Sequence, residues 1–415
     1  MEAAIDEKPD GYREESPGDN SILMIAPKRR IDFFLMFTVI GLAFFGVIMI
    51  FSASYYVTLR TDNDPFEFLR SAAFWAGGGL ILMVVFAYIP FRIWQVLAVP
   101  FLIFSFALLV LLFPFGDTLN GATRWIRVGP ITIMPGEIAK FGCIAFTAWF
   151  YTKYRKRTEN FILGFMPPVL VMGLCFVLIF KQPNLSTALI LCGIIAGMMF
   201  IAGVKKRYLL MSMFAGLAVV ALLIYSNPAG EHYRRFQSYL DPFADTQGDS
   251  YQIVQSLLAL GAGGLAGTGP GGSVQKAFYL PYAQNDFIFA IIGEELGFLG
   301  CLVIMIAYLI LIWRCTLVAL GAPDRFSMLL ASGITIMLAL QVIINIAVVT
   351  ASIPATGVIL PFISYGGNAT VLFMIAMGIM LNISRASPRP AVVKLPEKRR
   401  KKEEVQYDIR TSEVQ

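Results

Sequence analysis

The stretch from Tyr251 to Glu295 holds the side chains of this chain that are best suited to catalysis. It begins with polar residues, passes through a glycine-rich region to Asp286, and then enters a long apolar segment that carries Glu294 and Glu295. Carboxylates at the mouth of a membrane segment are costly and indicate a function by default. One positioned carboxylate can act as a general base. We therefore take Asp286 as the candidate catalytic residue.

The neighbouring carboxylates are assigned to structural support. Glu294 lies eight residues beyond Asp286, about 12 Å away along a helix at roughly 1.5 Å per residue. That distance is too long for the two groups to share a proton.

Half-apolar surroundings should raise the pKa of Asp286 toward the range of a useful general base.

Other familiar catalytic signatures are missing from the sequence. The single histidine, His232, leaves no histidine metal cluster and no Ser-His-Asp triad. The glycines of residues 261–272 lack the Gly-Lys-Ser/Thr ending of a phosphate loop and do not join a strand to a helix, so no organic cofactor is expected. The five cysteines have no paired spacing and are interpreted as packing residues.

Composition indicates a polytopic all-α membrane protein. Of the 415 residues, 57% are hydrophobic and only 14% are charged, whereas soluble domains carry about 25% charged residues. The net charge of +6 comes largely from a basic tail and short basic loops. We interpret these as topology signals, and no nucleic-acid partner is expected.

About ten apolar runs form the elements that must position Asp286, each near the roughly 20 residues that a bilayer requires. The first is too long for a signal-peptide core of about 7–15 residues and is interpreted as a retained anchor. The expected spans are 33–51, 72–90, 93–114, 136–153, 162–180, 186–204, 207–226, 287–313, 327–350 and 362–384.

Basic residues alternate across successive spans and therefore predict the orientation. They place both termini in the cytoplasm and leave 54–71, 115–135, 181–185, 227–286 and 351–361 outside. Residues 1–30 and 386–415 are predicted to be cytoplasmic tails, the first disordered and the second basic, around a membrane domain at 31–385.

The external segment 227–286, between spans 7 and 8, is far longer than the usual connection of about 4–6 residues. Its first part suggests short amphipathic helices, and its glycines indicate sharp turns or close approach to a ligand. A flexible connector is the alternative. Apolar residues suited to packing favour a folded segment: Val274, Phe278, Leu280 and Tyr282.

Four further polar clusters lie on the predicted outer side. Arg124 and Arg127 flank Trp125 and suit a pyrophosphate, although interfacial anchoring would use the same residues. Glu137 and Lys140 are three apart on a helix and can pair, either as structure or to position the site.

The remaining clusters concern the backbone. The sequence KQPNLST at 181–187 reads by itself as a tight turn before a helix. The sequence PATGVILPFISYGGNA at 354–369 breaks helical structure at membrane depth. Irregular backbone is tolerated there only inside protein or against a water-filled cavity, which favours a site over a simple hairpin.

These motifs together resemble the SEDS proteins (shape, elongation, division and sporulation), such as FtsW and RodA, over about residues 30–385. GEELGFLG and the long charged tails are more similar to FtsW. The resemblance is carried by NGATRWI at 120–126, the Glu137/Lys140 pair, QPNLST at 182–187, DPFADTQGDSYQIVQS at 241–256, LPYAQNDFIFAIIGEELGFLG at 280–300 and TGVILPFISYGGN at 356–368.

The chain departs from the family pattern at four positions. Asn184 and Ser186 stand where the family commonly has Asp and Gly, Gly136 stands where a Ser precedes the Glu, and Asn368 replaces a Ser. Asn184 puts in doubt a charge-dependent role at that position and leaves the Asp286 region intact.

The resemblance implies a GT-C-like, inverting peptidoglycan glycosyltransferase that polymerises lipid II at the outer face of the cytoplasmic membrane during division or elongation. Its implied partners are the nascent glycan strand, a class B penicillin-binding protein and other division or elongation membrane proteins. Asp286 would be the base, and cations or a divalent metal held by Asp286, Mg²⁺ or Mn²⁺, would stabilise the undecaprenyl pyrophosphate leaving group. The residues expected to bind substrate are Arg124, Trp125, Arg127, Lys181, Gln182, Arg234, Arg235, Gly269, Ser364, Tyr365 and Gly366.

Two other classes of function stay open. A lipid II flippase predicts ionisable groups near the bilayer midplane and broken helices in two symmetric halves. Here the polar groups cluster on the predicted outer side and no internal repeat is visible, which favours the enzyme. A catalytically silent division scaffold is disfavoured by Asp286 and the glycine-rich segment.

Overall fold

The computed structural model describes residues 31–60, 64–119, 122–129, 131–226, 230–243, 248 and 250–386. The predicted cytoplasmic tails, 1–30 and 386–415, lie outside these residues except for Ala386. The described elements run in the order α1 (Phe33–Arg60), α2 (Glu67–Tyr88), α3 (Arg92–Phe115), β1 (Asp117–Leu119), β2 (Ala122–Val128), β3 (Ile131–Ile133), α4 (Pro135–Lys153), η1 (Arg155–Arg157), η2 (Phe161–Phe165), α5 (Met166–Phe180), α6 (Leu185–Ala202), α7 (Lys206–Tyr225), α8 (Glu231–Leu240), α9 (Tyr251–Gly263), α10 (Gln275–Phe278), α11 (Ile288–Leu320), α12 (Arg325–Val349) and α13 (Gly367–Ala386).

The ten expected spans correspond to α1–α7 and α11–α13, with the π-helical turn η2 leading into α5. Among the described residues, nine helices are long and apolar enough to cross a membrane. Helix α4 corresponds to the span expected at 136–153 but is not among these nine, because its 19 residues include Glu137 and Lys140, which lower its hydropathy. The chain is therefore a multi-pass membrane protein. Four boundaries differ clearly from the prediction: α1 continues to Arg60, α2 begins at Glu67, α11 continues to Leu320, and residues 362–366 are not helical.

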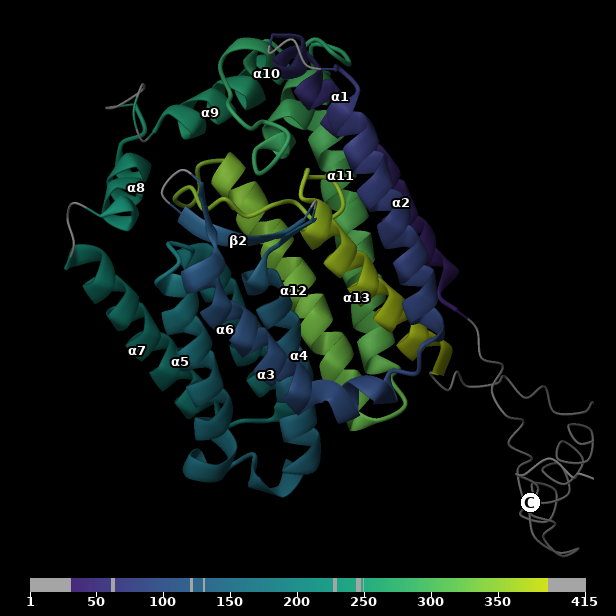
Figure 1. Ribbon diagram of the computed structural model, residues 1–415, viewed down its shortest axis with the longest axis vertical. Helices are drawn as coiled ribbons and strands as arrows, with labels where there is room; N and C mark the ends of the chain where they lie inside the picture. Colours follow the sequence, from purple (N-terminus) through teal and green to yellow (C-terminus); the bar gives the residue numbers. More distant parts are fainter. Residues whose placement is uncertain are drawn as a thin grey trace, which may run out of the picture. The chain divides into compact units, whose positions relative to one another are not determined.

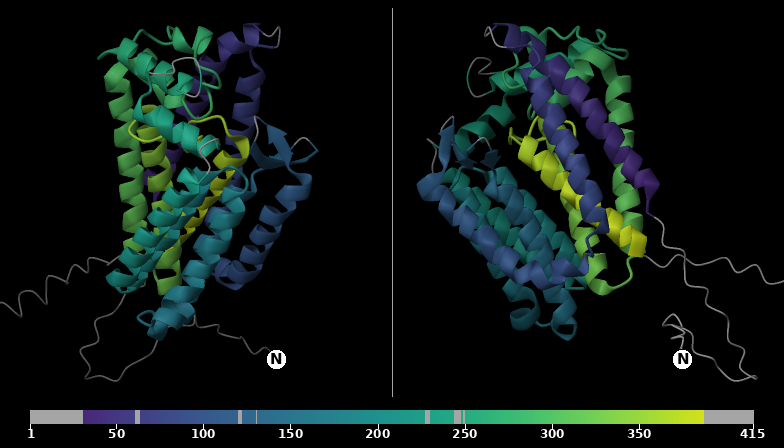
Figure 2. Two further views of the ribbon diagram at one scale, coloured as in Figure 1. Left: turned by 90° about the vertical axis from the view of Figure 1, so that its left-hand side faces the viewer. Right: turned by 45° about the vertical axis from the view of Figure 1, so that its right-hand side comes forward.

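Figure 1 shows that β2, α8, α9 and α10 gather at one end of the helices. We call this the loop-rich end, and it comprises the described residues of 116–134, 226–287 and 350–366. The connections from α4 to α5 and from α11 to α12 lie at the opposite end, as the second views also show (Figure 2). The long segment between α7 and α11 is thus folded into helices, as the sequence predicted.

Helix α12 is the central element. It packs against α4, α6, α11 and α13 as well as α9, and most of its residues are buried. Two polar side chains, Gln341 and Asn345, are fully buried in it, at 1% and 0% exposure. Buried polar groups in a membrane helix need internal partners, and these two find theirs at Lys140 and at the Asp286 region.

The span expected at 287–313 is a bent helix. Gly297 has φ 69° and ψ −169°, which interrupts α11. A Cβ placed on Gly293 would lie 3.3 Å from the Cys301 sulfur, although eight helical residues normally cover about 12 Å. The limb at 288–296 therefore folds back beside the limb at 298–320, which is long enough by itself to cross a bilayer.

A small antiparallel sheet, in the order β1–β2–β3, joins α3 to α4. The sequence reading did not predict it. The pairing of β1 with β2 shifts register at Arg124, because Asp117 pairs with Trp125 and Thr118 with Thr123, so regular strand alternation does not hold at this residue. Arg127 pairs with Asp117 of β1 at 3.3 Å on an exposed surface.

Small residues let the helices approach closely, as is usual in membranes. The most extensive helix pair is α2 with α13, where a Cβ on Gly378 would lie 2.5 Å from the Met83 carbonyl oxygen. Between α4 and α5, the Cys143 and Cys175 sulfur atoms lie 3.6 Å apart as free thiols.

We expect Gly378→Ala to destabilise the protein by about 1–3 kcal/mol, because the added methyl group overpacks against backbone that cannot rotate away. Thermal unfolding in detergent measures this effect. The control is Gly77→Ala in α2, whose Cβ would meet no atom within 4 Å. Equal melting temperatures for the two variants would contradict the close α2–α13 contact.

Candidate active site at the loop-rich end

Asp286 lies directly before α11, and α12 holds its backbone. Asn345 Nδ2 donates to the Asp286 carbonyl at 2.8 Å and to the Val358 carbonyl at 2.7 Å. An amide nitrogen carries two donor hydrogens, so this one side chain satisfies both carbonyl groups. Asn345 thereby fixes Asp286 relative to the non-helical segment that leads to α13.

That segment, residues 351–366, offers further carbonyl groups to its neighbours. Arg235 Nη1 donates to the Ala355 carbonyl at 3.1 Å, and Ser186 Oγ donates to the Thr356 carbonyl at 2.9 Å. Non-helical backbone at membrane depth is stable only when such groups are satisfied. The segment is therefore held by α8 and α6 together with α12.

Gly357 lies next to both the predicted catalytic carboxylate, Asp286, and one predicted cation, Arg124. A Cβ at this position would lie 3.5 Å from Arg124 Nη1 and 3.7 Å from Asp286 Oδ2. Gly357 has φ +67°, which L side chains rarely adopt. Both reasons favour glycine there, and its missing side chain leaves the two functional groups bordering one small space.

Arg124 is oriented by the turn before α6. Its Nη2 donates to the Pro183 carbonyl at 2.5 Å, so the QPNLST motif supplies a backbone acceptor. Asn184 caps α6 by accepting from the Thr187 amide at 3.3 Å. An asparagine fulfils this capping role as well as an aspartate does, so the departure at this position leaves the local structure intact.

The carboxyl group of Asp286 has opposing influences on its pKa. Burial raises the pKa above the usual range, while a hydrogen bond with its own backbone and the charges of Arg235 and Arg124 lower it. The side chain keeps partial exposure, as contact with a substrate requires. The net rise brings Asp286 closer to the working range of a general base.

Other predicted substrate-binding residues take different places. Trp125 of β2 is half-buried, and Lys181 and Arg234 are exposed. Gln182 is buried, and its side-chain amide donates to the Leu109 carbonyl at 3.1 Å. Gly269 donates its amide to the Glu295 carbonyl at 3.0 Å, at the bend of α11. The packing of segments far apart in the chain, which residue spacing does not reveal, separates these positions.

Ser364, Tyr365 and Gly366 line a pocket against α1 and α2. Its other walls include Val47, Trp75 and Thr370. The Tyr365 hydroxyl lies 3.0 Å from Ser71 Oγ, and the Tyr365 amide donates to the Gln284 carbonyl at 2.8 Å. The last bond joins this pocket to the chain two residues before Asp286.

The Glu137/Lys140 pair is buried in α4. Lys140 Nζ lies 2.8 Å from Glu137 Oε2 and donates to Gln341 Oε1 at 2.9 Å. Lys140 has 0% exposure and Glu137 has 4%. The pair therefore ties α4 to the central helix α12, one turn from Asn345.

Sequence reasoning missed Gln341 and Asn345. A signal existed for both, since polar residues four apart in an apolar helix are costly and usually have partners. Gly357 belongs to the 354–369 segment that the sequence marked as a site, but only the structure places it beside Arg124 and Asp286.

The residues around Asp286 fit an anion better than a resident metal ion. Among the described residues, no group of three or more His, Cys, Asp or Glu side chains could hold a metal. The charged groups that act on Asp286 are arginines. Guanidinium groups match phosphate oxygens and repel a divalent cation, so these side chains do not fit the Mg²⁺ or Mn²⁺ ion that the resemblance implied.

Comparisons with known proteins agree with this architecture. The model of a family described as cell cycle protein, covering FtsW, RodA and SpoVE, matches residues 33–389. Stage V sporulation protein E of Bacillus subtilis is 40% identical over 366 residues, covering 88% of this chain and all of that protein. The probable peptidoglycan glycosyltransferase FtsW of Geobacter sp. strain M18 is 37% identical, covering 85% of this chain and 96% of the relative.

Solved structures show the same fold. A chain of a peptidoglycan synthase complex, described as coordinating polymerization and crosslinking, superposes with a TM-score of 0.74 at 27% identity, covering 87% of this chain and 99% of that one. The rod shape determining protein RodA of Thermus thermophilus gives 0.64 at 25% identity, covering 87% and 98%.

The helical bundle, with a carboxylate and arginines gathered at its loop-rich end, defines a polytopic membrane protein with a candidate site at that end. This chain belongs to the FtsW/RodA/SpoVE family of cell cycle proteins. The expected SEDS membership and fold are confirmed.

We expect Glu137→Gln and Lys140→Met each to destabilise the protein by about 3–5 kcal/mol, because each leaves a buried charge without its partner. The double variant should recover part of this loss. Thermal unfolding and polymerisation rate are the measurements, and Lys205→Met at the exposed Lys205–Glu159 pair is the control. Two single variants that match the wild type would show that the buried pair is dispensable.

Proposed function

We propose that this protein polymerises lipid II into glycan strands, as a peptidoglycan glycosyltransferase of the outer face of the bacterial cytoplasmic membrane. The observation that carries the proposal is the placement of the Asp286 carboxylate beside Gly357 and Arg124, within the field of Arg235. Relatives that match most of this chain are named peptidoglycan glycosyltransferases.

The reaction follows from these groups. Asp286 accepts the proton of the attacking 4-hydroxyl of a GlcNAc residue as the new bond forms between that oxygen and the anomeric carbon. The bond from the anomeric carbon to the pyrophosphate oxygen breaks at the same time, and the leaving group departs from the opposite face with inversion. Arg124 and Arg235 stabilise the negative charge that develops on the pyrophosphate.

Both arginines are held in position by hydrogen bonds to backbone carbonyl groups. Arg124 is anchored on the Pro183 carbonyl and Arg235 on the Ala355 carbonyl. Charged donors held in place before the reaction need little reorganisation when charge develops.

The membrane orientation in this proposal rests on the basic residues. Arg155–Arg157 lie between α4 and α5, Lys205 precedes α7, and Lys206, Arg207 and Arg325 stand at the first positions of α7 and α12. The connections from α4 to α5 and from α11 to α12 lie at the end opposite to the loop-rich end (Figure 1). Cytoplasmic loops carry the excess of Lys and Arg, so the loop-rich end with Asp286 faces outward.

The proposed crosslinking partner is a class B penicillin-binding protein. Its support is the fold shared with a chain of a synthase complex that couples polymerization to crosslinking. The FtsW names of several relatives favour a role in division, alongside other division membrane proteins.

Asp286→Asn should reduce lipid II polymerisation by about 10²–10⁴-fold, because it keeps the shape of the side chain and removes the base. The assay is polymerisation of labelled lipid II by the purified protein, with and without its penicillin-binding partner. Asp117→Asn, which changes an exposed carboxylate at the same end, is the control. Near-normal polymerisation by folded Asp286→Asn protein would overturn the role of Asp286 as the base. Absence of polymerisation by the wild-type protein would instead favour a flippase.

Arg235→Gln should move the acidic limb of the kcat/KM profile to higher pH. The base must be ionised, so activity falls as pH drops through the pKa of Asp286. Arg235 lowers that pKa, and losing its charge therefore raises it. Arg234→Gln, at the exposed neighbouring residue, should leave the midpoint of the limb in place. An unchanged midpoint in Arg235→Gln would contradict the electrostatic coupling.

A further inference from the structure

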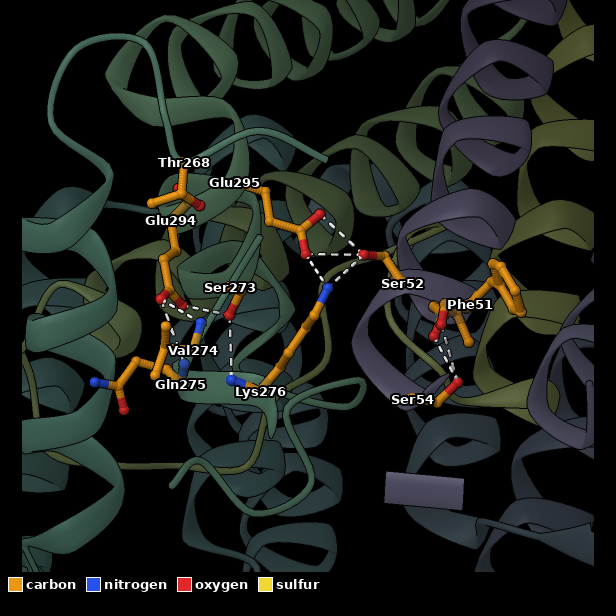
Figure 3. Close-up of polar contacts among 11 residues, drawn as sticks. Phe51, Ser52, Ser54, Thr268, Ser273, Val274, Gln275, Lys276, Glu294 and Glu295 are labelled. Carbon is orange, nitrogen blue, oxygen red and sulfur yellow. Dashed lines mark hydrogen bonds and ion pairs between the residues drawn. The ribbon is translucent and has the colours of Figure 1, made fainter. Parts of the chain in front are cut away.

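The bend of α11 holds a second charged cluster, which the proposed chemistry does not use. It consists of Ser52 of α1, Ser273 and Lys276 around α10, and Glu294 and Glu295 of α11 (Figure 3). Glu294 and Glu295 are each 1% exposed and Lys276 is 2% exposed. We call these five residues the α10 latch.

The first half of the latch is an ion pair with a shared hydroxyl. Lys276 Nζ pairs with Glu295 Oε1, and Ser52 Oγ donates to the same carboxylate at 2.8 and 2.9 Å. Lys276 Nζ also lies 2.8 Å from Ser52 Oγ. The pair thus joins α1, α10 and α11 in one buried contact.

In the second half of the latch, Glu294 accepts hydrogen bonds from the backbone amides at the start of α10. Glu294 Oε1 accepts from the Val274 amide at 2.8 Å and the Gln275 amide at 3.3 Å, and its other oxygen accepts from Ser273 Oγ. The first amides of a helix lack partners within the helix. A carboxylate that accepts from them fastens α10 to the bend of α11.

Backbone hydrogen bonds also hold the glycine-rich segment against the bend of α11. The 288–296 limb ends at the bend and leaves carbonyl groups open, and Thr268 and Gly269 donate their amides to Glu294 and Glu295 at 2.9 and 3.0 Å. The glycine-rich segment 263–272 therefore packs against this bend. A Cβ on Gly267 would collide with the Glu295 backbone, so some of these glycines serve chain packing.

Asp286 lies between the two fastened points. Residues 279–287 run from α10 to α11, and Leu280, Ala283 and Phe287 are buried in this connection. The chain before Asp286 is held through Lys276, and the limb after it is held through Glu294 and Glu295. Moving α10 would therefore move the connection that carries the catalytic carboxylate.

We propose that Lys276 and Glu295 are positioning residues that hold residues 279–287, and with them Asp286, against Arg124 and Gly357. The inference rests on the proposed function for its kinetic consequence. Removing one charge of a buried pair leaves the other uncompensated, so the latch opens while the helices remain packed. A displacement of about 1 Å at a reacting group costs on the order of 10²-fold in rate.

The test compares Lys276→Met, Glu295→Gln and their double variant by hydrogen–deuterium exchange and by polymerisation kinetics, using the full chain in detergent. We expect faster exchange at 264–287 in each single variant, with unchanged exchange in α12 and α13. We expect kcat to fall about 10- to 100-fold, with a smaller change in KM because Arg124 and Arg235 lie outside the latch. The double variant should recover both readouts in part, since no charge is left alone.

The matched control is Arg70→Met at the exposed Arg70–Asp64 pair, which should change neither readout. Exchange at 264–287 that stays at the wild-type level in both single variants would overturn the latch. Faster exchange with wild-type kcat would overturn the positioning role. If the wild-type protein does not polymerise lipid II, the proposed function fails, and the exchange data still decide whether the latch holds residues 279–287.

Discussion

The site depends on one side chain that bonds two segments of non-helical backbone. Asn345 donates to the carbonyls of Asp286 and Val358 from the buried face of α12. Carbonyl groups without partners are expensive where water is scarce, so both segments are stable only in the positions where this amide reaches them. Ser186 and Arg235 donate hydrogen bonds to further carbonyl groups of the 351–366 segment in the same way. The requirement for hydrogen bonds thus brings residues from α6, α8, α11 and α12 to one place.

The loop-rich end holds two kinds of charged group: a carboxylate that keeps partial exposure, and carboxylates and a lysine that are buried with internal partners. Asp286 keeps partial exposure and faces two arginines, an arrangement that tunes its pKa and receives an anionic leaving group. Glu294, Glu295 and Lys276 are almost wholly buried and are occupied by internal partners. A substrate cannot compete easily for groups that are already paired. The partly exposed acid is therefore suited to chemistry, and the buried acids are suited to holding the chain.

The glycines of this protein also serve separate purposes. Gly378 permits close packing of α13 on α2, and Gly267 permits the glycine-rich segment to pack on the bend of α11. Gly357 instead leaves space between Arg124 and Asp286. Each function follows from the atoms that surround the residue, and the same residue type in the sequence cannot distinguish them.

The sequence by itself determined the membrane class and nearly all the long helices, because hydropathy and charge are local properties of the chain. It also nominated Asp286, Arg124, Arg235 and the Glu137/Lys140 pair as site or support residues. Only the tertiary structure decided that Arg127 pairs with Asp117 while Arg124 bonds the Pro183 carbonyl. The bend of α11 at Gly297 and the contacts of Asn345 and Lys276 also appear only there. A single backbone conformation and contacts between residues far apart in the chain produce these features. Such contacts depend on how distant segments pack against each other, and residue type and spacing alone do not specify that packing.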